Sequence, residues 1–144
     1  MRLYRKILIP TDGSDTANKA VTHAINLAEA LNAELHAMYV VDISAFAGLP
    51  TEIVWENMKN LLKSESDTAM KSIEKKATEK EIKFEKIVKE GVPAEEIVKT
   101  AKEIQADLIV MGTSGRTGLD KFLLGSVAEK IIRTSPCPVL VVHK

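Results

Sequence analysis

Apolar residues along this chain follow two alternating patterns, short continuous runs and longer stripes with helical spacing. Continuous runs such as Ile7 to Ile9 predict strands that are buried on both faces of a sheet. Imperfect alternation of apolar and charged residues at 82–89 predicts an edge strand with one wet face. The predicted strands span residues 6–11, 34–41, 82–89, 107–113 and 139–143, and the predicted helices span residues 15–32, 51–80, 93–105 and 127–132.

The strict alternation of strand and helix predicts an α/β fold with an open parallel sheet and helices on both faces. We expect one domain over residues 1–144, since a chain of this length can bury a real core. The pattern alone permits the strand orders 2-1-3-4-5 and 3-2-1-4-5. In either order, ligands bind beyond the carboxyl ends of the strands, where the winding direction switches.

The segment between the fourth strand and the last helix has the composition of a phosphate-binding loop. It contains Gly112, Gly115 and Gly125, and Ser126 follows as a candidate N-cap of the last helix. Glycine lets the backbone approach a phosphate, and the free N–H groups of a first helical turn favour negative charge. The segment contains neither the P-loop motif nor the Gly-x-Gly-x-x-Gly dinucleotide fingerprint.

These four residues form the pattern Gly-x2-Gly-x9-Gly-Ser, which resembles the universal stress protein family. Segments 6–14, 36–41, 107–112 and 135–142 are similar to the same family in the same order. The resemblance implies the strand order 3-2-1-4-5 and a fold like that of the adenine nucleotide alpha hydrolases. It also implies a cytoplasmic domain, usually dimeric, whose members with this loop bind ATP.

The implied strand order places the first and fourth strands side by side, with the nucleotide site at their carboxyl ends. Asp12 has two compatible roles there, to cap the first helix together with Ser14 and to face the ribose or a Mg²⁺ ion. Arg116 and Lys121 are either solvated loop charges or donors to phosphate. By composition Val41 and Met111 belong to the core, and the family implies that their edges also form an apolar slot for adenine. The expected nucleotide-binding residues are Pro10, Thr11, Asp12, Val41, Met111, Gly112, Gly115, Arg116, Gly125, Ser126 and Val127.

Charge and cysteine content exclude several other classes. The 20 Lys and Arg residues balance the 20 Asp and Glu residues, so no net field attracts nucleic acid or acidic lipid. The single cysteine, Cys137, cannot form an internal disulfide, which fits a reducing compartment. The first residues lack the apolar stretch of a secretory signal, so we expect none, and no apolar run approaches the roughly 20 residues of a membrane helix. We therefore expect a soluble, cytoplasmic protein.

The sequence favours a regulatory domain that binds ATP, or AMP or ADP, with Mg²⁺ held through the phosphates. We expect it to act as a nucleotide-dependent switch or stress-response factor through an unidentified protein partner. No set of catalytic residues stands out, so a slow ATPase is the first alternative. A nucleotide-independent interaction module is the second. The apolar last strand, from Val139 to His143, lies at a sheet edge in the implied order and predicts a homodimer through that edge.

Overall fold

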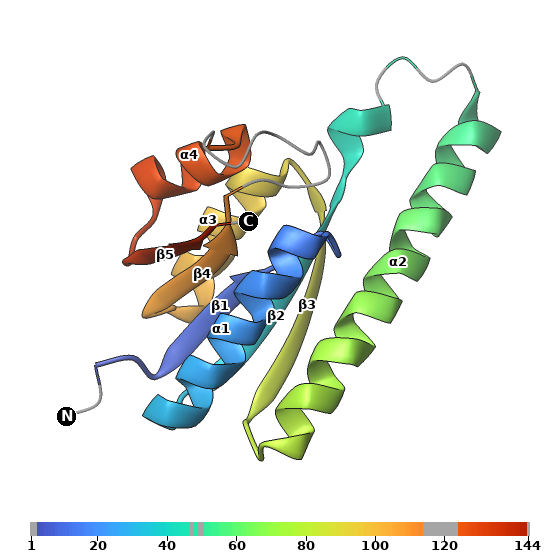
Figure 1. Ribbon diagram of the computed structural model, residues 1–144. Coiled ribbons are helices and arrows are strands. Elements are labelled where there is room, and N and C mark those ends of the chain that lie inside the picture. Colours follow the sequence, from blue (N-terminus) through green and yellow to red (C-terminus); the bar gives the residue numbers. More distant parts are fainter. Residues whose placement is uncertain (1–2, 47, 49–50, 114–123, 144) are drawn as a thin grey trace.

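A computed structural model describes residues 3–46, 48, 51–113 and 124–143. Within this part of the chain, five parallel strands form one sheet in the order β3-β2-β1-β4-β5 (Figure 1). This order confirms the one that the family resemblance implies and excludes 2-1-3-4-5. The strands are β1 (Lys6–Pro10), β2 (Glu34–Asp42), β3 (Phe84–Gly91), β4 (Leu108–Gly112) and β5 (Val139–Val142).

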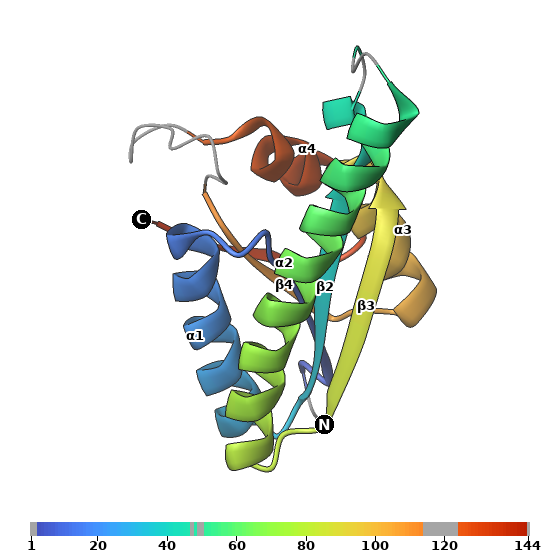
Figure 2. The same ribbon diagram turned by 90° about the vertical axis from the view of Figure 1, so that its right-hand side faces the viewer.

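Helices cover both faces of the sheet, as Figure 2 shows. One face carries α1 (Asp15–Leu31) and α2 (Glu52–Glu79), and the other carries α3 (Pro93–Ile104) and α4 (Ser126–Thr134). A short 3-10 helix, η1 (Ile43–Phe46), follows β2. Side chains alternate across each strand, so Ile7 and Ile9 pack in the core under α1 and α2, while Leu8 packs in the core under α3 and α4.

The ends of the helices follow from local capping chemistry. The Ser14 hydroxyl accepts a hydrogen bond from the N–H of Ala17 (3.2 Å), and the Thr51 hydroxyl accepts one from the N–H of Val54 (3.2 Å). The turn after α2 contains Glu81 with φ 56°. This turn delays the third strand, which spans Phe84–Gly91 rather than the predicted 82–89.

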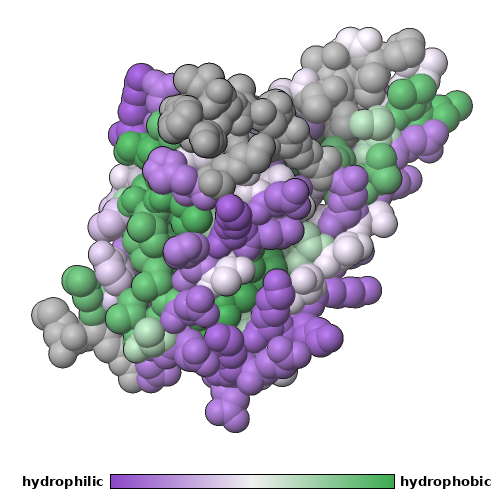
Figure 3. Space-filling view, viewed as in Figure 1, coloured by the Kyte–Doolittle hydropathy of each residue, from purple (hydrophilic) through white to green (hydrophobic). Residues whose placement is uncertain are grey.

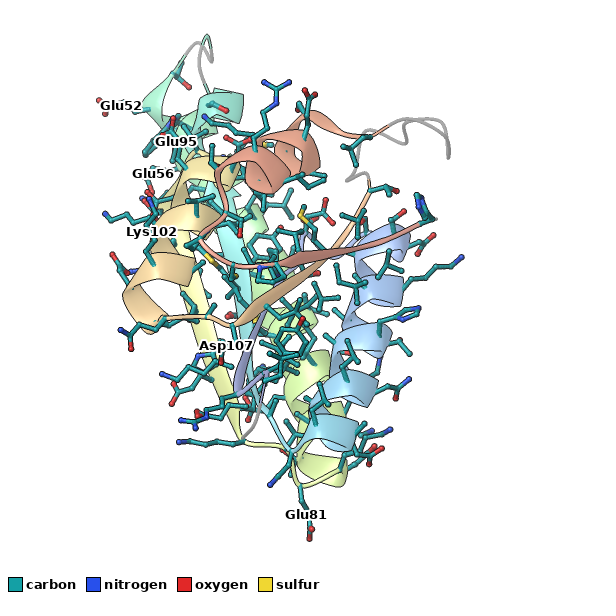
Figure 4. All side chains as sticks on the ribbon, turned by 90° about the vertical axis from the view of Figure 1, so that its left-hand side faces the viewer. Glu52, Glu56, Glu81, Glu95, Lys102 and Asp107 are labelled. Carbon is teal, nitrogen blue, oxygen red and sulfur yellow. The ribbon has the colours of Figure 1, made fainter. Side chains whose placement is uncertain are left out.

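A carboxylate fixes the amino end of the sheet. Asp107 Oδ2 accepts hydrogen bonds from the backbone N–H groups of Arg5 (2.9 Å) and Lys6 (3.0 Å). Figure 4 shows Asp107 where α3 leads into β4, at the end of the sheet opposite to Glu95. Asp107 thus has a structural role at the amino end of the sheet, whereas a cavity lies at the carboxyl end. In the described segments, no helix is long and apolar enough to cross a lipid bilayer.

Candidate functional site

A cavity of about 440 Å³ lies at the carboxyl ends of β2, β1 and β4. The starts of α3 and α4 border it, and Met58 and Leu62 of α2 form part of its wall. The expected site residues that line it are Pro10, Thr11, Asp12, Met111, Gly112, Gly125, Ser126 and Val127. The fold therefore brings together residues that are more than 100 positions apart in the sequence.

A second, larger hollow of about 550 Å³ lies between α1 and α2 and shares Asp12 with the first. Its lining contains neither Gly112 nor Gly125, and small polar residues of α2 such as Ser64, Thr68 and Ser72 form one wall. The glycines and the N-terminus of α4 gather only at the first cavity in the part of the chain described here. We therefore take the smaller cavity as the candidate nucleotide site.

The side chain of Val40, and not that of Val41, borders this cavity. Val41 is fully buried in the core under α1 and α2, while Val40 packs with the opposite core. Met38 and Asp42, two residues to either side, line the cavity with Val40. The core position that composition favours for Val41 is confirmed, while the side chain that borders the cavity lies one residue earlier, because neighbouring side chains of a strand point to opposite faces.

Three expected residues, Gly115, Arg116 and Lys121, lie outside the residues that the structure describes. Their approach to a phosphate stays a prediction.

The N-terminus of α4 opens at the cavity without a side-chain cap. Gly125 is the N-cap, with φ −66° and ψ 157°, and Ser126 is the first helical residue, so the expectation that Ser126 caps the helix is wrong by one position. The Gly125 N–H donates to the carbonyl oxygen of Thr113 (2.7 Å), which ties the start of α4 to the end of β4. In the part of the chain that the structure describes, no cap side chain accepts from the N–H groups of the first turn, which suits an anion site.

The other two helix starts near the cavity are less suited to an anion. At α1, the Ser14 cap already accepts from the N–H of Ala17, and Asp12 Oδ1 accepts from the N–H of Ser14 (2.9 Å). At α3, the first turn carries Glu95 and Glu96, whose charges repel an anion. The capping role expected for Asp12 and Ser14 is thus present. Charge and capping together favour α4 as the phosphate end of the cavity.

Gly112 has a packing role that the sequence did not reveal. A Cβ atom at this position would lie 2.7 Å from Cγ2 of Thr16 and 3.2 Å from the backbone carbonyl carbon of the same residue. A glycine at the end of β4 therefore lets the first turn of α1 pack against the strand. Gly13, in contrast, has φ 80° with open space around it, so its glycine serves the turn itself.

His36 is a buried ionisable residue of the sheet, but it does not belong to the cavity. His36 on β2 is buried, and burial lowers its pKa, although the Glu34 carboxylate 3.7 Å from its Nε2 acts in the opposite direction. This histidine lies near the amino end of the sheet, away from the cavity. Among the residues that the structure describes, no group of three or more His, Cys, Asp or Glu side chains could hold a metal ion.

Comparison with known proteins identifies relatives over nearly the full length. The model of the universal stress protein family matches residues 3–143. Universal stress protein MJ0531 of Methanocaldococcus jannaschii is 55% identical over 142 residues, which cover 99% of this chain and 84% of that protein.

Solved structures with the same fold include that of MJ0577 from Methanocaldococcus jannaschii, with 37% identity and a TM-score of 0.80 over 97% of this chain and 96% of that one. A universal stress protein crystallised in complex with cAMP has 27% identity and a TM-score of 0.70, with 97% of each chain covered.

Proposed function

The chain belongs to the universal stress protein family, and from this premise we propose that it binds an adenine nucleotide, ATP foremost, in the cavity at the carboxyl end of the sheet. The observation that carries the proposal is the cavity itself, which runs from an apolar end at β2 to the uncapped N-terminus of α4. The complex of a relative with cAMP supports an adenine nucleotide as the ligand class.

The proposed orientation follows from the two chemically different ends of the cavity. The phosphates lie against Gly125 and Ser126, where backbone N–H groups and the helix dipole favour negative charge. The base lies at the β2 end, between Val40 and the apolar side chains Met58 and Ile97. Met111, whose side chain is buried beneath the cavity, supports the middle of the ligand.

Binding is favoured over catalysis. Turnover of ATP needs a residue that orients an attacking water as well as groups that stabilise the phosphoryl charge. The α4 N-terminus meets the second need. In the described lining near α4, Asp12 is the only candidate to orient an attacking water. Its carboxylate already accepts a hydrogen bond from the Ser14 N–H. Slow hydrolysis is the alternative, with Mg²⁺ bound through the phosphates.

We also propose a homodimer through β5. This strand is a sheet edge whose Leu140 side chain is 39% exposed, and Figure 3 shows apolar surface over β5 and beside it. The opposite edge, β3, carries exposed charges at Glu85, Lys86 and Lys89, a pattern that discourages pairing. Two copies joined at β5 would pair unsatisfied backbone groups and cover the apolar side chains.

We further propose that the protein acts in the cytoplasm as a nucleotide-dependent switch in a stress response. An unidentified protein partner would bind one nucleotide state in preference to the other. Mass spectrometry of the gently purified protein tests the ligand. Co-purified ATP would support the binding function, and ADP alone would point to turnover. A protein that carries no nucleotide and takes up none when ATP is added would favour a nucleotide-independent interaction module.

A further inference from the structure

Asp42 is a carboxylate at the β2 end of the cavity that is held in a fixed orientation. It is the last residue of β2 and shares the cavity-facing side of the strand with Met38 and Val40. Its Oδ1 atom accepts hydrogen bonds from the backbone N–H of Ser44 (3.0 Å) and from the Ser44 hydroxyl. For its other oxygen, Oδ2, no hydrogen-bond donor is present in the part of the chain that the structure describes.

Asp42 is half-buried, and apolar side chains from two helices line the same end of the cavity. Met58 and Leu62 of α2 and Ile97 of α3 line the cavity on this side, and no Lys, Arg or His is found in the described lining. The nearby lysines of α2, Lys59 and Lys63, instead contact Glu90 at 3.1 and 3.5 Å. A carboxylate oxygen in such a pocket is best satisfied by a ligand that donates a hydrogen bond and covers the apolar walls.

The sheet geometry allows a nucleotide base to lie beside Asp42. β2 and β4 flank β1, so they are two strand spacings apart across the sheet, about 10 Å. The register pairs Pro10 with Met38, so β2 continues for four residues, roughly 13 Å, beyond the end of β1 and forms a wall above it that ends at Asp42. With the phosphates at the N-terminus of α4, on the β4 side, the sugar crosses the end of β1 and the base reaches the end of β2. A base at this end would lie beside Asp42, with the apolar side chains of the lining against its rings.

We propose that Asp42 selects the base, by accepting a hydrogen bond from the exocyclic 6-amino group of a purine. This inference rests on the proposed function, because it names the specificity of the same site. The preference requires that Oδ2 face the substituent at C6 and not the ring N1, because the N1–H of a 6-oxopurine also donates. At C6, a 6-amino group donates to the carboxylate, whereas the carbonyl oxygen of a 6-oxopurine accepts and is repelled. Asp42 is thus a specificity-determining residue, in addition to its contacts with Ser44.

Calorimetry with three triphosphates tests the role of Asp42: ATP, ITP, and purine riboside triphosphate, which lacks the 6-amino group. The wild-type protein should bind ATP about 10- to 100-fold more tightly than either analogue, the range expected for one hydrogen bond to a charged group. D42A should bind ATP and purine riboside triphosphate with equal affinity. D42N keeps an oxygen that can accept from Ser44 and gains an N–H₂ donor, so its preference should move toward ITP.

Two controls separate recognition of the base from support of the turn. S44A removes a contact to Oδ1 and leaves the carboxylate, so it should keep the preference for ATP. Circular dichroism reports whether D42A folds, and D42N tests the proposal even if D42A does not. A D42A or D42N protein that keeps the wild-type preference would overturn the role of Asp42. Equal wild-type affinity for all three triphosphates would overturn it too but leave the proposed function intact, whereas no binding of any triphosphate would overturn both.

Discussion

Among single residues, Gly112 decides how closely α1 approaches the end of β4. Thr16 occupies the space that a side chain at position 112 would need, so this glycine positions the first turn of α1 and the Asp12 turn before it. The same residue lines the cavity. A glycine that the sequence presents as part of a phosphate loop therefore also sets the packing on which the site depends.

His36 predicts a specific pH dependence of stability. Burial lowers its pKa, Lys6 acts in the same direction, and the carboxylates of Glu34 and Glu85 oppose the effect. The neutral form is thus favoured in the folded state, so its stabilisation is fully present above the unfolded-state pKa of about 6.5 and is lost as the pH falls through the lower folded-state pKa. Urea unfolding at pH 7.5 and 5.0 should show a smaller loss of stability for H36L than for the wild type. Identical losses in the two proteins would contradict this account.

Most of the residues expected from the sequence line the cavity, but two positions differ by one residue from the expectation. The family resemblance pointed to Val41, and the structure shows that the side chain of Val40 borders the cavity instead, a difference that the apolar pattern of β2 cannot reveal because both valines fit it. Serine is a common N-cap residue, so the sequence favours Ser126 at this position. The structure places the N-cap at Gly125, whose backbone is extended. Such differences arise from backbone geometry, which side-chain type indicates only statistically.

Among the helices and strands of the described residues, the hydrophobic pattern predicted the four α-helices and the five strands but not the short 3-10 helix η1 (Ile43–Phe46). The long helix α2 (Glu52–Glu79) begins at its Thr51 cap and matches the predicted 51–80 closely. The boundaries of β3 were less predictable, since its exposed edge carries charges that provide a weak pattern. The strand order required the family resemblance, because hydrophobic pattern alone does not specify which strands are neighbours.

The start of α3 predicts a stabilising substitution. Val92 occupies the N-cap position with an extended backbone and no side-chain hydrogen bond, and it is 40% exposed. V92S should provide the missing acceptor and raise the free energy of unfolding by about 0.5–2 kcal/mol relative to V92A. Chemical denaturation of the two variants measures the difference. If V92S is no more stable than V92A, the first turn of α3 does not need this cap.

For the molecule as a whole, the two edges of the sheet predict where a second copy binds. V141K places a charge in the proposed β5 interface and should shift the protein to a monomer, as measured by sedimentation. V88K makes the same change on the β3 edge, where Val88 is 41% exposed, and should leave a dimer intact. A folded V141K protein that remains dimeric would remove β5 from consideration as the interface.

The proposed binding function also predicts slow turnover. Purified protein with Mg²⁺ should hydrolyse ATP far below the roughly 1 to 10³ per second typical of enzymes. Asp12 lies at the cavity beside the Ser14 cap, so D12N should reduce nucleotide or metal affinity at least as much as it reduces any residual rate. Steady turnover near one per second, lost selectively in D12N at saturating ATP, would instead make Asp12 a catalytic residue.

The central claim is that a nucleotide lies in the cavity with its phosphates at the start of α4, and calorimetry of ATP binding to the wild type and G125V tests it most directly. Gly125 has φ −66°, which valine tolerates, so the variant should fold while its side chain fills the phosphate end. We expect the wild type to bind ATP, G125V to bind none, and S126A to lose about 1–3 kcal/mol of binding free energy. Wild-type affinity in a folded G125V protein would show that the segment before α4 is only a structural turn.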